Sequence, residues 1–115
     1  MSKSSTITED PATQRSLALS PSVHPGEYLR EELLDPLGLT PYALAARIGV
    51  PRTRIERLVR EQTRITPDTA LRLGRFFSMS PAFWLNLQAR HDLAAAETRA
   101  GNDIAAIVPL AGSAA

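Results

Sequence analysis

Residues 44–60 read LAARIGVPRTRIERLVR, and the order of small, apolar and basic residues in this stretch decides the fold. Gly49 has no Cβ, so it can adopt the left-handed conformation that a tight turn requires. Ala45 is small enough to let two helices approach each other closely. Larger apolar residues on both sides of the glycine would fill the seam between the helices: Leu44, Ile48, Val50, Ile55 and Leu58. The pattern predicts two short helices joined by a tight turn.

The second of these helices carries a concentration of basic side chains. At about 100° per residue, Ile55, Leu58 and Val59 share one stripe, and the four arginines between residues 52 and 60 face outward or flank it. The net charge is −2 over residues 1–50, +4 over 51–75 and −1 over 76–115. Because the positive charge is concentrated in one segment, it favours an anionic partner that binds at one face of the protein. The alternative is an ordinary solvated helix face.

Pairs of a hydroxyl residue and proline recur along the chain and indicate where helices begin. Each pair supplies a capping oxygen at the N-cap and a residue without an N–H at the next position. The pairs are Thr40-Pro41, Thr66-Pro67 and Ser80-Pro81, with His24-Pro25 as a weaker fourth. Glycines at 38, 49 and 101 are expected to end helices, because glycine tolerates the left-handed C′ position. The predicted helices are about 25–35, 41–48, 51–60, 67–77 and 81–100, which gives an all-α, compact five-helix bundle.

Composition excludes several other classes of protein. The chain has 115 residues and no cysteine, which fits one small domain in a reducing compartment. No segment has the length or apolar character of a membrane span or signal peptide, so we expect a cytoplasmic protein with no membrane partner. His24 and His91 lie far apart in the sequence and match no metal-binding spacing, so we expect no metal site and no cofactor. Glu27, Glu31 and Glu32 are expected to form a solvated acidic face of a helix and not a pair for acid-base catalysis, so we do not expect an enzyme.

The spacing around Gly49 resembles the helix-turn-helix of the phage-repressor-like (XRE/Cro) family at six positions. That resemblance implies a second helix lying in the DNA major groove, with the first helix crossing the backbone. The implied base contacts are Arg52, Thr53, Arg54 and Arg57. The implied phosphate contacts are Thr40, Tyr42, Arg60 and Arg64. The sequence departs from the family pattern at Pro41 and Pro51, and Pro51 offers no side-chain oxygen to cap the second helix.

Motifs outside the turn resemble the HigA-type (VapI-like) antitoxins over about residues 23–95. They are HPGE at 24–27, LREE at 29–32, PLGL at 36–39, TP at 66–67 with LRL at 71–73, and SPAFWLNLQ at 80–88 followed by Asp92-Leu93. This resemblance implies a protein that binds a HigB-type mRNA-cleaving toxin and, as a homodimer, represses its own operon. Two recognition helices would then enter successive major grooves of a palindromic operator, about 34–36 Å apart.

Domain boundaries follow from the same reading. Residues 1–22 are expected to form a disordered arm, 23–100 the helix-turn-helix domain, and 101–115 a C-terminal tail. The tail could supply an intersubunit strand or a toxin-facing segment, or remain unstructured. In the last helix, Trp84, Leu87 and His91 are expected at a dimer interface, with Leu85 and Leu93 adding apolar area. Completion of the monomer core by Phe83 and Trp84 is the alternative.

Two other functions remain open from the sequence. A free-standing repressor of the same fold would need no toxin. A protein-interaction module could instead use the arginines of residues 52–60 to bind an acidic protein surface. A steep dependence of affinity on salt distinguishes DNA binding from binding to a protein surface, because neutralised phosphates release counterions.

Overall fold

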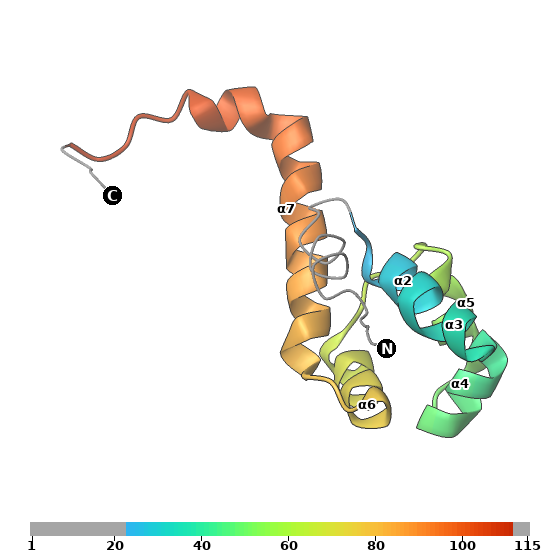
Figure 1. The fold of residues 1–115 in the computed structure, drawn as a ribbon. Helices are drawn as coiled ribbons and strands as arrows, with labels where there is room; N and C mark the ends of the chain where they lie inside the picture. The colour runs from blue at the N-terminus through green and yellow to red at the C-terminus, as the bar shows by residue number, and fades with distance from the viewer. Residues whose placement is uncertain (1–22, 112–115) are drawn as a thin grey trace, which may run out of the picture.

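The structure, a computed structural model, describes residues 23–111, and all regular structure within that range is helical. In chain order the elements are α2 (Pro25–Tyr28), η1 (Leu29–Leu34), α3 (Asp35–Leu37), α4 (Pro41–Ile48), α5 (Arg52–Val59), α6 (Pro67–Phe77) and α7 (Pro81–Ala105). The first three run on as one rod, so five helical rods surround the core (Figure 1). The expected all-α helix-turn-helix bundle is confirmed. The expectations for residues 1–22 and 112–115 lie outside the described residues.

The helix-turn-helix forms at the predicted place. α4 and α6 begin and end where the sequence indicates, because Thr40 and Thr66 each accept a backbone N–H at the third position beyond, at 3.0 and 3.3 Å. Gly49 ends α4 with a φ of 74°. α5 starts at Arg52, one residue later than predicted, because Pro51 takes the N-cap position and makes no side-chain capping bond.

The first rod contains a wide turn that the sequence analysis did not predict. Residues Leu29–Leu34 form a π-helix, and the N–H of Asp35 bonds to the carbonyl of Arg30, five residues back. Pro36 follows directly. In an α-helix its ring would collide with the carbonyl four residues earlier and it could donate no bond, so the wider turn accommodates it. The rod ends as expected at Gly38, with a φ of 63°.

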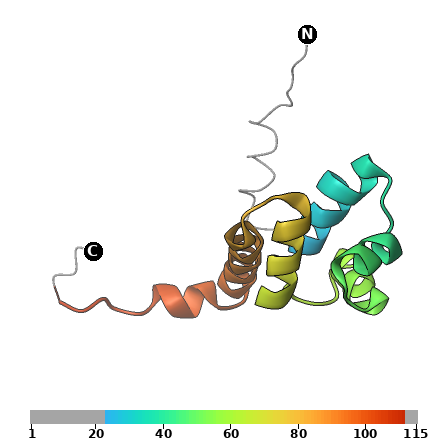
Figure 2. The same ribbon diagram turned by 90° about the horizontal axis from the view of Figure 1, so that it is seen from below.

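α7 does not end at Gly101, and the prediction that it would is wrong. The helix continues to Ala105, with one non-helical residue at Ala100 (φ −128°, ψ 15°). No atom outside its own helix backbone lies within 4 Å of the position a Cβ would take on Gly101. In Figures 1 and 2 the chain beyond this kink turns away from the other helices. Ile107, Val108 and Leu110 are exposed there.

The core lies between α7 and the other helices, with Trp84 at its centre. Trp84 is 0% exposed and meets the ring of Tyr28 edge-on at 5.8 Å, and Leu87 is 2% exposed. His91, half-buried, meets His24 edge-on at 5.0 Å. These three side chains share the face of α7 that is covered by the chain's own helices. The burial of Trp84 and Leu87 within the single chain favours the alternative that Trp84 completes the monomer core.

The HPGE motif forms a joint between the first rod and α5. The Nδ1 atom of His24 accepts the N–H of Gly26 at 2.9 Å and so caps α2, while Pro25 fills the first helical position. A Cβ on Gly26 would lie 1.7 Å from the carbonyl oxygen of Leu58 at the end of α5. Only glycine allows the two backbones to approach this closely.

Neither a membrane helix nor a metal site is present in the described part of the chain. None of its helices is long and apolar enough to cross a bilayer. In residues 23–111, no group of three or more histidine, aspartate or glutamate side chains is arranged to hold a metal ion.

Candidate nucleic-acid interface

α5 presents one apolar face to the core and one polar face to the outside. Ile55, Leu58 and Val59 are buried. On the opposite side Arg52, Thr53 and Arg57 are exposed, as the helical spacing predicts. The turn at Gly49 therefore holds a short helix whose outward face is rich in guanidinium groups, and this is the surface that major-groove reading requires.

The first turn of α4 borders this face on one side. Tyr42 is 64% exposed, and the guanidinium carbon of Arg52 lies 5.8 Å from the centre of its ring. Arg52 also lies 3.4 Å from Glu56, one turn along α5. Thr40 caps α4 by accepting the N–H of Ala43. An aromatic ring and a carboxylate thus restrain Arg52 at the start of α5.

A groove of about 470 Å³ borders the face on the other side. It lies between α5 and the segment that leads into α6. Its lining residues are Pro51, Thr53, Arg54, Arg57, Thr63, Arg64, Thr66, Asp68 and Thr69. The structure thus brings three of the four predicted base contacts and one predicted phosphate contact, Arg64, to a single groove. Arg60, exposed at the end of α5, does not line it.

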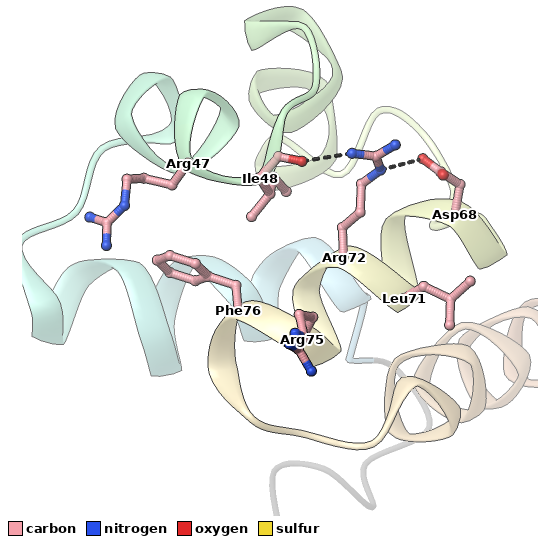
Figure 3. Close-up of a pocket in the computed structure, with 7 residues that line it drawn as sticks. All are labelled: Arg47, Ile48, Asp68, Leu71, Arg72, Arg75 and Phe76. Atoms are coloured by element: carbon pink, nitrogen blue, oxygen red, sulfur yellow. Dashed lines mark hydrogen bonds and ion pairs between the residues drawn. The ribbon is translucent and has the colours of Figure 1, made fainter.

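Arg54 is engaged within the protein. Its guanidinium lies 2.6 Å from a carboxylate oxygen of Asp68, and the same oxygen accepts from Arg72 at 3.0 Å. Arg72 also donates to the carbonyl of Ile48 at 2.8 Å, as Figure 3 shows between α4 and α6. Hydrogen bonds from Arg54 and Arg72 hold the pKa of Asp68 below its ordinary value. The carboxylate therefore stays ionised and keeps both arginines in place.

α7 holds the loop that carries Arg64. Arg64 pairs with Asp92, and Gln88 accepts the N–H of Ile65 at 2.8 Å while donating to Asp92 at 3.0 Å. Partial burial would raise the pKa of Asp92, but the hydrogen bonds from Arg64 and Gln88 outweigh that effect and lower it. The loop beside α5 is thereby tied to α7.

Sequence reasoning missed the acidic partners of these arginines. Asp68 and Arg72 are spaced i,i+4 on one helix, and that signal was available. Arg54 and Asp68 are separated by 14 residues, and Arg64 and Asp92 by 28. Such pairs arise only when α5, α6 and α7 have packed, so no local pattern indicates them.

The chain is similar to known helix-turn-helix proteins. A family model described as Helix-turn-helix matches residues 29–84. Virulence-associated protein I of Dichelobacter nodosus is 50% identical over 90 residues, which are 78% of this chain and 82% of that protein. Antitoxin HigA-1 of Vibrio cholerae is 38% identical over 68 residues, 59% of this chain and 64% of that one. A solved structure of the Pseudomonas aeruginosa antitoxin HigA with the higBA promoter is similar at 43% identity and a TM-score of 0.74, covering 77% of this chain and 98% of that one.

Proposed function

Because this chain belongs to the HigA-type antitoxins of the helix-turn-helix family, we propose that it is an antitoxin that occupies operator DNA through the outward face of α5. The observation that carries the proposal is the set of exposed arginines on a helix held by the turn at Gly49. The solved Pseudomonas aeruginosa relative is described with promoter DNA, which supports the same use of the face.

Base reading is assigned to Arg52, Thr53 and Arg57. The planar fork of an arginine can donate to guanine O6 and N7 together, worth about 1–3 kcal/mol of discrimination. The methyl group of Thr53 can contact a thymine. The phosphate contacts, which position the protein without reading sequence, are assigned to Thr40, Tyr42, Arg60 and Arg64.

A second copy of the chain is proposed to pack on the uncovered face of α7. Leu93 is 69% exposed there and lies in a groove of about 670 Å³, whose lining is Arg64, Ile65, Pro67, Leu85, Gln88, Ala89, Asp92, Leu93 and Ala96. Arg64 belongs to this groove and to the one beside α5, so the two surfaces are contiguous. A two-fold axis at this surface would present two recognition helices to one side of a palindromic operator. The bound dimer would repress transcription by occluding the promoter.

The toxin partner is proposed to be of the HigB type, an mRNA-cleaving protein. The support is family membership and the name of the Vibrio cholerae relative. Co-purification with the product of the adjacent reading frame tests this part, and failure to co-purify would favour a free-standing repressor with the same DNA-binding face.

Operator binding is tested by gel-shift titration on the DNA upstream of the coding sequence, at two salt concentrations and with a scrambled competitor. The wild-type chain should give specific, salt-sensitive retardation. Arg57→Ala should lower operator affinity and relax base preference by about 1–3 kcal/mol at one position. Arg99→Ala removes the same charge from an exposed site on α7 and should change little. Equal binding by wild-type and Arg57→Ala protein would exclude this docking.

A further inference from the structure

We propose that Asp68 is a positioning and specificity residue, which holds Arg54 away from the DNA backbone and so suppresses non-specific binding. The inference rests on the proposed function, because it concerns the same DNA-binding face. Asp68 places a negative charge on a surface whose proposed partner, DNA, is also negative, and this charge needs a physical explanation.

The contacts of Asp68 join three parts of the helix-turn-helix. One of its oxygens lies 2.6 Å from Arg54 on α5 and 3.0 Å from Arg72 on α6. Arg72 donates to the carbonyls of Ile48 and Gly49, at 2.8 and 3.5 Å, in the turn itself. Figure 3 shows Arg72 reaching between Ile48 and Asp68. The recognition helix, the turn before it and the helix after it are therefore linked through one carboxylate.

Ion pairing separates the arginines beside α5 into two kinds. Arg54 pairs with Asp68, Arg64 with Asp92 and Arg52 with Glu56. Within residues 23–111, Arg57 is the arginine of the groove that forms no ion pair. The side chains of Arg54 and Asp68 are 41% and 54% exposed, so the pair stands at the rim, where a phosphate would otherwise meet Arg54.

This arrangement favours specificity over affinity. An arginine free at the rim could neutralise a phosphate on any sequence, and this gain is largest in the non-specific complex, where no base contact fixes the position of α5. Pairing it with Asp68 removes that general gain and adds repulsion against a misplaced backbone. The proposed base contacts Arg52, Thr53 and Arg57 then account for a larger share of the binding energy. Discrimination between operator and other DNA depends on the ratio of specific to non-specific affinity.

Direct base reading by Asp68 is the competing role, since a carboxylate can accept from cytosine N4. One carboxylate oxygen of Asp68 already accepts from two guanidinium groups, which fixes the orientation of the side chain. The two roles predict different results for Asp68→Asn on DNA that lacks the operator: stronger binding if Asp68 holds Arg54, and unchanged binding if Asp68 reads a base.

The test is Asp68→Asn, which keeps the side-chain shape and removes the charge. Its binding to scrambled DNA should strengthen several-fold at low salt, and the slope of log affinity against log salt should steepen by about 0.9, the value for one more phosphate contact. Operator affinity should change less, so the specificity ratio falls. Asp103→Asn, at an exposed site on α7, controls for net charge and should leave the slope unchanged.

A double variant, Arg54→Gln with Asp68→Asn, should return the slope to its wild-type value. Circular dichroism confirms folding, and Asp68→Ser replaces Asp68→Asn if that variant unfolds. An unchanged slope on scrambled DNA would overturn the proposal. Weaker operator binding with unchanged scrambled-DNA binding would overturn it in favour of base reading. The slope on scrambled DNA does not depend on the operator assignment, which fails separately if wild-type protein shows no preference for upstream DNA.

Discussion

At the scale of single residues, the HPGE motif combines local helix capping with one close contact to a distant element. His24 caps α2 with a ring nitrogen, and Gly26 admits the carbonyl of Leu58 from α5. The motif was recognised from sequence as a family feature, but the reason for its glycine lies 32 residues further along the chain.

Replacing that glycine should be costly. Gly26→Ala places a methyl group 1.7 Å from the Leu58 carbonyl oxygen, where neither backbone can yield without moving a helix. We expect a loss of about 3 kcal/mol or more in the free energy of unfolding, measured by urea denaturation. Gly101→Ala is the matched control, because nothing packs within 4 Å there, and it should gain up to about 1 kcal/mol. Similar stabilities for the two variants would contradict the close-approach argument.

Stability should also depend on the protonation of His24. Burial lowers its pKa below the ordinary value of 6.5, and the charge of His91 lowers it further, while Glu61 and Asp92 oppose the shift. The unfolded chain therefore binds the proton more readily, and stability should fall as the pH drops below 6.5 toward the folded pKa. The loss is about 1 kcal/mol, the value of a helix cap, because protonated Nδ1 cannot accept.

Urea denaturation between pH 7.5 and 5 measures this dependence. His24→Asn retains a capping oxygen without titrating, so its stability should vary less over that interval. An equally steep fall in His24→Asn would assign the pH dependence to other groups.

At the scale of elements, helix boundaries divide into those that local chemistry decides and those that it does not. Thr40-Pro41 and Thr66-Pro67 start helices because the cap and the proline act within one turn of each other. Gly101 is different. A glycine inside a helix costs only about 1 kcal/mol, so the helix ends there only if the following chain favours the left-handed turn. The kink at Ala100 shows that it bends and continues.

The tie between α7 and the loop before α6 predicts a measurable contribution from Gln88. Gln88→Ala leaves the buried N–H of Ile65 without its acceptor, and should lower the free energy of unfolding by about 1–3 kcal/mol. Asn86→Ala, exposed on the same helix, serves as control and should be close to neutral. Thermal or urea unfolding compares the two, and equal stability would mean that the loop does not need α7.

At the scale of the whole molecule, the two faces of α7 have different roles. One face carries Trp84 and Leu87 into the core, and the other leaves Leu93 uncovered by the described chain. The sequence analysis predicted an apolar excess on this helix, and the burial of Trp84 and Leu87 favours its alternative, in which Trp84 completes the monomer core. We therefore propose the dimer surface on the side of α7 that adjoins Arg64.

Leu93→Asp should therefore yield a folded monomer. A charge at an exposed position of the chain costs little stability, but in a dimer it would be buried without a partner. Sedimentation equilibrium should show the loss of dimer, with weaker operator binding and unchanged circular dichroism. Trp84→Ala, by contrast, should lose about 3–5 kcal/mol of stability, because the indole fills the core. A Leu93→Asp variant that remains dimeric would place the interface elsewhere.

The sequence by itself determined the positions of α4, α5 and α6, the turn at Gly49 and the outward direction of the arginines. Caps, prolines and helical periodicity act over a few residues and can be read along the chain. Only the tertiary structure decided which arginine is engaged, which face of α7 is buried, and why Gly26 is a glycine. Asp68 meets Arg54, and Leu58 meets Gly26, only after separate helices have packed. These contacts depend on the relative placement of helices, which no local spacing encodes.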